Sequence, residues 1–297
     1  MSASQQTHEP VGANGSTRVV MLGTGTPRPD PNRSGPATAI VVNDTPYLID
    51  FGPGVIRRAT AAYENGVTAI GFGGVNIKTV FLTHMHSDHT VGYPDLIFTP
   101  WVMGRQEPLT VYGPNGIKAM TEHVLKAWQI DIDGRTTGIN QRDVTGYKVE
   151  AHEIAPGVVY RDRNVTVTAF PVRHEEMVDS FGFRFDTPDR CIVISGDTAP
   201  NPTLIEHSRG CDVLIHEAYS EASHQQVSPR SQEFRRCHHT SAVELAAIAN
   251  EVKPGLLVIY HRSNAGGRSI DPEDVLLDEI RATYKGRVVM GHDLDIF

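Results

Sequence analysis

Short apolar runs that end at glycine-containing turns are the most regular pattern along this 297-residue chain. The first run, Val19 to Leu22, stops at the sequence Gly-Thr-Gly-Thr-Pro, which is typical of a buried strand followed by a turn. Continuous apolar runs of this kind predict strands that are covered on both faces. The predicted strands after the first are Ala37 to Val42, Tyr47 to Ile49, Thr79 to Thr83, Leu109 to Tyr112, Val165 to Phe170, Cys191 to Ser195, Val213 to Ile215 and Leu256 to Tyr260.

Helical segments separate several of these strands. The predicted helices are Val55 to Tyr63, Gly92 to Phe98, Gly116 to Trp128, Ser241 to Val252 and Pro272 to Tyr284. In contrast, three strand segments follow one another without a helix, namely Val149 to Tyr160, Val165 to Phe170 and Phe181 to Phe185. A doubly wound sheet needs strict alternation of strand and helix, so this order does not fit one. We therefore predict an α/β fold in which two mixed sheets pack together and the helices lie outside.

Neither a shift in composition nor a long linker divides the chain. Residues 1–17 form a polar leader, and residues 18–297 are expected to fold as one domain. The leader contains no apolar segment of the kind found in secretory signal peptides. No stretch of the chain reaches the roughly 18 to 20 apolar residues that a membrane span needs. These features predict a cytoplasmic protein with no membrane partner.

Charge and cysteine content narrow the class further. The formal net charge is −8 at pH 7, so the average surface does not favour a polyanion such as nucleic acid. The three cysteines, Cys191, Cys211 and Cys237, match neither a disulfide framework nor a CxxC zinc site. The 14 histidines exceed an even share for this length, and the chemistry is expected to follow from their positions.

One predicted strand delivers three histidines and one aspartate within six positions, at His84, His86, Asp88 and His89. A turn after a buried strand can direct such side chains at a common centre. Neutral imidazole and carboxylate are usual ligands of zinc in proteins. Hydrogen bonds alone do not easily satisfy so dense a cluster, so these residues predict a metal site.

This segment resembles the HxHxDH signature of the metallo-β-lactamase superfamily. Three further ends of predicted strands follow in the order of the family, at His174, Asp197 and His261. The resemblance spans Val19 to about Asp295, which is nearly the whole chain. It implies a four-layer αββα sandwich of two mixed sheets with outer helices.

The resemblance also implies a centre for two metal ions. The family pattern assigns His84, His86 and His174 to one ion, Asp88, His89 and His261 to a second, and Asp197 to both. Since every ligand is His or Asp, two zinc ions are favoured, while manganese or iron stay open. Such a centre makes a water acidic and polarises the bond to be split. This implies hydrolysis by attack of a metal-bound hydroxide, with Asp88 among the catalytic residues.

Several motifs resemble those of one branch of the superfamily, the ribonuclease Z and metal-dependent arylsulfatase branch. They are Leu22 to Pro27 with a following Arg33, Val111 to Gly116, His216 to Tyr219, and His239 to Ala242 at the start of a predicted helix. The family pattern implies that His239, oriented by Glu217, protonates the leaving oxygen. In the rival interpretation, His239 only marks the start of a helix that Thr240 or Ser241 caps.

One departure from ribonuclease Z changes the expected substrate. Those enzymes insert a basic arm, rich in glycine and proline, between the third histidine motif and the GDT-like strand, and the arm grips tRNA. Here Glu175 to Arg190 alone occupies that interval, which is room for one strand and a turn. Without the phosphate contacts of the arm, an acidic chain loses much of its expected affinity for tRNA. We therefore expect a small-molecule oxyacid ester as substrate, either a phosphodiester or an aryl sulfate.

Three alternatives stay open at the level of the sequence. The first is a tRNA 3′ endonuclease like ribonuclease Z, with nucleic acid as the partner. The second uses the same fold to hydrolyse a lactone, a β-lactam or a thioester. The third is metal-dependent sensing without catalysis. Because related enzymes are often dimers, a homodimer also stays open.

Other side chains near these motifs complete the expected site. Trp101 and Arg105 follow a predicted helix and are candidates for an aromatic wall and an anion clamp around the substrate. Asp50 either orients a metal ligand or caps the helix that begins at Val55. The remaining candidates are expected to be ordinary surface or core residues, namely His152, His224 and His292.

Overall fold

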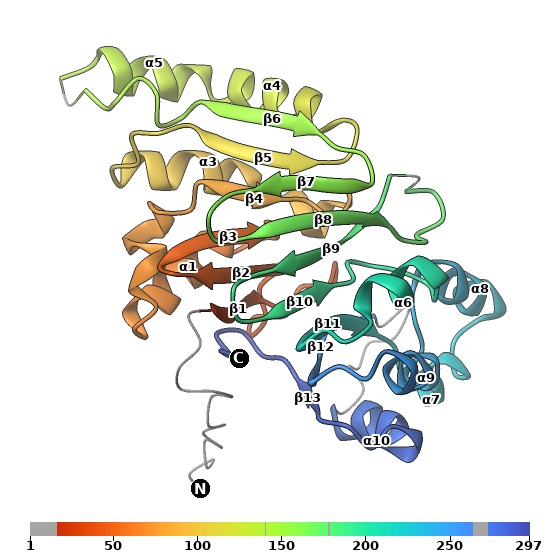
Figure 1. The fold of residues 1–297 in the computed structure, drawn as a ribbon. Helices are drawn as coiled ribbons and strands as arrows, with labels where there is room; N and C mark the ends of the chain where they lie inside the picture. The colour runs from red at the N-terminus through yellow and green to blue at the C-terminus, as the bar shows by residue number, and fades with distance from the viewer. Residues whose placement is uncertain (1–16, 140, 178, 264–272) are drawn as a thin grey trace, which may run out of the picture.

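The computed structural model describes residues 17–139, 141–177, 179–263 and 273–297 (Figure 1). The predicted polar leader lies outside these residues except for Thr17, which already belongs to the first strand, β1 (Thr17–Gly23). The three cysteines are free, in line with the absence of a disulfide pattern. Among the helices of the described ranges, none combines the length and apolar character that crossing a membrane requires.

The first sheet has six strands and comes from the N-terminal half of the chain. In spatial order they are β1, β2 (Ala37–Val42), β3 (Thr45–Ile49), β4 (Thr79–Phe81), β5 (Leu109–Gly113) and β6 (Val149–Glu153). The first three strands pair antiparallel, and β3 to β6 run parallel. Asn43 and Asp44 join β2 to β3 with positive φ values of 46° and 62°, as a two-residue type I′ hairpin turn requires.

The second sheet has seven strands and comes from the rest of the chain. In spatial order they are β13 (Val288–Met290), β12 (Leu256–Arg262), β11 (Val213–Ala218), β10 (Cys191–Ile194), β9 (Phe181–Asp186), β8 (Thr166–Pro171) and β7 (Gly157–Arg161). Neighbours from β10 to β13 run parallel, and neighbours from β7 to β10 run antiparallel. Both sheets are therefore mixed, as predicted.

The main core lies between the two sheets. Successive residues of a strand point to opposite faces, so Val19 contacts the second sheet while Val20 packs under the outer helices. Phe81 of β4 meets Phe183 and Phe185 of β9 at centroid distances of 5.6 and 5.4 Å. Because most strands, though not β6 and β7, are buried on both faces, their apolar runs are continuous rather than alternating.

Helices cover the outer face of each sheet (Figure 1). The first sheet carries α1 (Val55–Glu64), α3 (Tyr93–Val102), α4 (Ile117–Ala127) and α5 (Gln129–Thr137). The second carries α6 (Pro202–Ser208), α9 (Ala242–Val252) and α10 (Glu273–Thr283). The short elements are η1 (Thr68–Ile70), η2 (Phe72–Gly74), α2 (Ser87–Thr90) and α7 (Glu221–His224). A further helix, α8 (Pro229–His238), follows α7. The predicted four-layer αββα sandwich is confirmed.

The structure differs from the predicted elements in three respects. The predicted strand segment Val149 to Tyr160 is two strands, β6 and β7, which belong to different sheets. Helix α3 continues to Val102, four residues beyond its predicted end at Phe98. Helices α5, α6 and α8 and strand β13 were not predicted. Helix α8 escaped notice because its sequence is polar on nearly every face, so it has no apolar period to detect.

Candidate metal centre and active site

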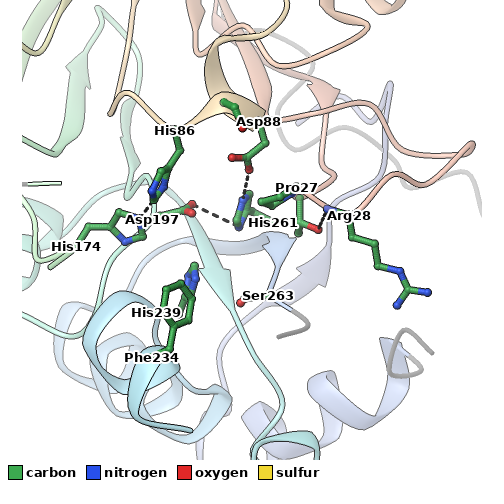
Figure 2. Close-up of a pocket in the computed structure, with 12 residues that line it drawn as sticks. Pro27, Arg28, His86, Asp88, His174, Asp197, Phe234, His239, His261 and Ser263 are labelled. Carbon is green, nitrogen blue, oxygen red and sulfur yellow. Dashed lines mark hydrogen bonds and ion pairs between the residues drawn. The ribbon is translucent and has the colours of Figure 1, made fainter. Parts of the chain in front are cut away.

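The predicted metal ligands lie together, although they are spread over almost 180 residues. Figure 2 shows five of them, namely His86, Asp88, His174, Asp197 and His261. The turn after β4 carries His84 and His86, and the one-turn helix α2 carries Asp88 and His89. The second sheet supplies the others from the ends of β8, β10 and β12, namely His174, Asp197 and His261. Loops that follow different strands therefore converge on one site.

Three imidazoles form the first cluster. Nδ1 of His86 lies 3.0 Å from Nε2 of His84 and 3.1 Å from Nε2 of His174. Burial lowers the pKa of all three, to about 4 for His174. The rings are therefore neutral near pH 7, and their nitrogen lone pairs are available to a metal ion.

Carboxylates join two further histidines in the second cluster. His261 Nε2 lies 3.1 Å from Asp88 Oδ2, and His89 Nε2 lies 3.5 Å from the same oxygen. Asp197 stands between the clusters, with Oδ1 3.4 Å from His261 Nδ1 and Oδ2 4.0 Å from His84 Nε2. The two triads that the sequence predicts are thus brought together, and Asp197 contacts both.

The backbone is bent to present two of these side chains. His261 has a φ of 41°, in the left-handed region that a residue with a Cβ adopts at a cost of order 1–3 kcal/mol. At the same point the pairing between β11 and β12 shifts register after Glu217. Gly196, directly before Asp197, has a φ of 63°. Strain of this kind is typical of functional sites, where the surrounding fold holds the chain in place.

Asp50 supports the second cluster through a contact with His89. Its Oδ2 lies 2.8 Å from Nδ1 of His89, and its Oδ1 accepts hydrogen bonds from the backbone and hydroxyl of Thr83. Helix α1 begins at Val55 after the N-cap residue Gly54, and no side chain caps it. Of the two roles considered for Asp50, the structure therefore shows the first, because the carboxylate orients a histidine and caps no helix.

The carboxylates of the second cluster favour a bound cation. Burial disfavours charge on His89 and His261, but the surrounding carboxylates outweigh it and raise the pKa of both rings. Burial also opposes ionisation of Asp197, yet His261 and His89 hold its pKa well below the ordinary value. Three atoms here are buried without a hydrogen-bond partner, namely His89 Nε2, His261 Nδ1 and Asp197 Oδ1. Unpartnered donor atoms that face one another fit a bound metal ion.

A histidine–glutamate pair stands beside the clusters. Nδ1 of His239 lies 3.0 Å from Oε1 of Glu217, which also accepts hydrogen bonds from the backbone N–H groups of Thr198 and Thr240. The contact with Glu217 orients the ring of His239, which lines the cavity. Burial lowers the pKa of His239 to about 4 and raises that of Glu217 well above its ordinary value. Because a lone charge is disfavoured on either group, the two side chains share their proton as a unit.

The helix cap expected in the rival interpretation is also present, and Ser241 provides it. The side chain of Ser241 accepts a hydrogen bond from the backbone of Glu244, whose carboxylate returns one to the Ser241 N–H. This capping box begins α9 two residues after His239. His239 itself lines the cavity, as Figure 2 shows.

The cavity over the clusters has a volume of about 340 Å³. Two of its walls were not predicted from the sequence. One is the loop after β1, with Pro27 and Arg28, and the other is Phe234 of α8 (Figure 2). The start of helix α8 could have been predicted, since Ser228 followed by Pro229 is a typical helix start.

Trp101 and Arg105 do not line this cavity, so the predicted substrate contacts are wrong. Trp101 lies in the last turn of α3, is buried in the layer beneath the helices, and donates its indole N–H to the carbonyl of Asp143. The buried guanidinium of Arg105 donates to the carbonyls of Leu96, Ile97 and Gly146. Both residues tie the end of α3 to the chain that follows, and this is a structural task.

The three histidines expected to be ordinary residues lie outside the clusters. His152 stacks on Tyr112, and His224 stacks on Tyr219. His292 is half exposed and contacts Glu273 and Asp295. The structure therefore agrees with that expectation.

The four-layer fold and the paired histidine–aspartate clusters at its strand ends define a class, the metal-dependent hydrolases of the β-lactamase fold. A family model described as a beta-lactamase superfamily domain matches residues 45–262, and the chain belongs to this superfamily. Ribonuclease Z of Mycobacterium bovis (strain BCG / Pasteur 1173P2) is 32% identical to it over 280 residues, covering 93% of this chain and 96% of that protein. The resemblance stated from the motifs is thereby confirmed.

Solved structures share the fold at lower identity. The metallo-beta-lactamase fold protein YhfI from Bacillus subtilis matches with a TM-score of 0.71 and 18% identity, covering 95% of this chain and 98% of that chain. The short form of human tRNase Z matches with a TM-score of 0.66 and 21% identity, covering 94% of this chain and 98% of that chain. At such identities these matches support the architecture alone.

Proposed function

We propose that the protein is a phosphodiester hydrolase whose first substrate class is RNA. The observation that carries this proposal is the Glu217–His239 pair, which stands in one cavity with both clusters and holds a proton next to the site of bond cleavage. The full-length relatives named Ribonuclease Z favour an RNA phosphodiester over the aryl sulfate that the sequence had placed beside it.

The seven clustered side chains would hold two divalent metal ions. One ion would use His84, His86 and His174, the other would use Asp88, His89 and His261, and Asp197 would serve both. Zinc suits this donor set, and manganese or iron are compatible with it. Bound there, the ions would supply Lewis acidity and make a water more acidic.

Side chains of the protein donate and accept the protons of the hydrolysis reaction. Water adds to phosphorus, the bond to the leaving oxygen breaks, and Nε2–H of His239 gives its proton to that oxygen. Glu217, whose pKa is raised by burial, passes a proton to Nδ1 of His239 as Nε2 loses its own, so the ring stays neutral and the glutamate carboxylate takes up the negative charge. Asp88 accepts a proton from the attacking water. The carbonyl of His238 accepts a hydrogen bond from Nδ1 of His174 (2.9 Å) and fixes that ring, as Asp50 does for His89.

A small phosphodiester is the second candidate, and a specific observation favours it. Between His174 and β10, the described residues form a short turn, strand β9 and a second turn closed by Thr187 and Arg190. No protruding arm is present among the described residues of this interval. A ribonuclease built on this chain would therefore hold its RNA through other surfaces, whereas a small diester needs only the cavity.

The experiment compares thymidine 5′-(p-nitrophenyl) phosphate with p-nitrophenyl sulfate, which have the same leaving group, on zinc- or manganese-loaded protein. A shared leaving group makes the ratio of kcat/KM report binding at the oxyacid centre. We expect a clear preference for the phosphodiester, loss of turnover with a chelator and recovery with added metal. A preference for the sulfate would contradict the proposal.

Two controls make the result specific. Asp197→Asn should lose turnover. Asp189→Asn should keep it, because the carboxylate of Asp189 contacts Thr17, the first residue of β1, away from the cavity. A tRNA with a 3′ extension then separates the two substrate classes. Cleavage at one defined position with a steep salt dependence would establish RNA, and no cleavage at low salt would leave the small diester.

A further inference from the structure

Phe234 occupies an unusual position for an aromatic residue. Helix α8 is polar, and its buried residues are Arg235 and His238, whereas the side chain of Phe234 is 43% exposed. Instead of joining a core, this ring lines the cavity over the metal clusters, directly beside His239 (Figure 2). An exposed aromatic ring at the edge of this cavity offers a flat apolar face to a planar group.

The ring is held in place from one side. It stacks on His238 at a centroid distance of 4.0 Å and an interplanar angle of 17°. His238 is fixed in turn, because its Nδ1 contacts the carbonyl of Phe234 at 2.8 Å and its Nε2 contacts Glu176 at 2.7 Å. One face of Phe234 is therefore packed, and the ring borders the cavity without needing to be ordered when a ligand binds. Such preorganisation lowers the entropic cost of stacking.

The position of Phe234 relates it to one particular part of the substrate. Its ring centroid lies 5.9 Å from that of His239, the residue that gives its proton to the leaving oxygen. Beyond Pro27 and Arg28 the cavity adjoins a second one of about 620 Å³, bordered by Ser34 and Gly54. The site thus consists of two adjoining cavities, and Phe234 lies on the side that receives the leaving group.

We propose that Phe234 is a specificity-determining residue that stacks on a planar ring in the leaving alcohol of the substrate. The chemistry fits a nucleobase or another aryl group, and the retained part of the phosphodiester occupies the second cavity. This inference rests on the proposed function, because it uses His239 to identify the side of the leaving group. Stacking of a base on an aromatic side chain is sequence-tolerant, so the preference is for a ring and not for one base.

The test uses dinucleotides that lack the base on one side or the other. Product analysis first shows which of the two alcohols leaves, and kcat/KM is then measured for the intact dinucleotide and both abasic analogues. For the wild type, removal of the base on the leaving side should lower kcat/KM about tenfold. Phe234→Ala and Phe234→Leu should remove this preference and keep turnover of the leaving-side abasic analogue within about twofold. Phe234→Tyr should retain the preference.

A matched control is Phe72→Ala, since Phe72 is a similarly exposed aromatic residue that contacts Tyr63 and does not line the cavity. This variant should keep the wild-type preference. The proposal is overturned if Phe234→Leu lowers kcat/KM equally for the intact and the abasic substrates. It is also overturned if the preference belongs to the base on the retained side. If the nucleobase has no effect but Phe234→Leu lowers kcat/KM for p-nitrophenyl diesters more than for alkyl diesters, an aryl ester would be the source of the ring.

A binding measurement separates failure of this inference from failure of the proposed function. Phe234→Trp places a fluorophore at the cavity, and titration with adenosine should quench its fluorescence in a saturable way, while Phe72→Trp should not respond. Saturable quenching without turnover of any phosphodiester would remove the proposed function and retain the stacking surface. Turnover without quenching and without a base preference would retain the proposed function and remove the stacking surface.

Discussion

Oδ2 of Asp50 lies 2.8 Å from Nδ1 of His89, and both side chains are buried. Asp50 directly follows β3 and has a positive φ of 59°, whereas His89 lies in helix α2. A carboxylate behind a ligating imidazole fixes the orientation of the ring and makes it a stronger base.

Asp50→Ala should therefore weaken binding of the metal ion assigned to His89, by about 10- to 100-fold. Metal content after dialysis and a zinc titration would measure the change. Asp162→Ala is a suitable control, because that carboxylate accepts hydrogen bonds from Tyr47 and Tyr160 away from the cavity. Full metal content in Asp50→Ala would show that Asp50 does not support metal binding through His89.

His239→Ala should slow hydrolysis of diesters with alkyl leaving groups by about 10²- to 10³-fold, because an alkoxide needs a proton as it leaves. A p-nitrophenolate leaves without one, so diesters of p-nitrophenol should lose less than about threefold. The measurement is kcat/KM across leaving groups of different pKa. Equal losses for both classes would rule out His239 as the general acid.

His292 should make stability depend on pH. Hydrogen bonds to Asp295 and Glu273 raise the pKa of His292 to about 9, whereas the unfolded chain has the ordinary value of about 6.5. The pKa of Glu273 is about 2, since His292, Arg33 and Arg262 outweigh its burial, so it stays ionised. The stabilisation is therefore complete below pH 6.5 and is lost as pH rises through 9.

Urea midpoints at pH 6 and pH 9.5 would test this dependence. The wild type should lose more stability than His292→Gln across the interval, by less than about 1 kcal/mol because the ring is half exposed. His123→Gln, which removes a ring that contacts the carbonyl of Ala119, should behave like the wild type. Identical pH profiles for the wild type and His292→Gln would show that the ion pair is not stabilising.

Arg105→Ala should destabilise the fold and leave KM unchanged. The buried guanidinium satisfies three carbonyls, and burial already lowers its pKa to about 10. Its removal leaves these carbonyls unpaired and should cost about 3 kcal/mol. Thermal unfolding and KM for a phosphodiester would separate the two effects. A raised KM with unchanged stability would return Arg105 to the substrate site.

The sequence predicted most of the two sheets because their strands are buried on both faces and their apolar runs are continuous. The metal clusters were predictable for a different reason, since each predicted ligand follows a strand and a motif connects them. Asp50 was ambiguous, because only the fold shows that its carboxylate turns back to His89 rather than forward to α1.

The errors follow from local geometry that the sequence does not determine. Helix α3 was expected to end at Phe98, which placed Trp101 in a loop near the site. The helix in fact continues through Pro100, so Trp101 falls on its inner face. Phe234 escaped prediction because nothing in the polar sequence of α8 indicates that the helix borders a cavity, and only the packing of His238 and His239 brings it there.

The passage of the chain from β6 to β7 divides the molecule into two consecutive halves, each of which builds one sheet. His84, His86, Asp88 and His89 belong to the first half, while the other three clustered residues belong to the second. Neither half can assemble the centre alone, so the centre forms only after distant parts of the chain have docked. During synthesis, the complete set of clustered residues is therefore available only after β12, which carries His261, has been made and has joined the second sheet.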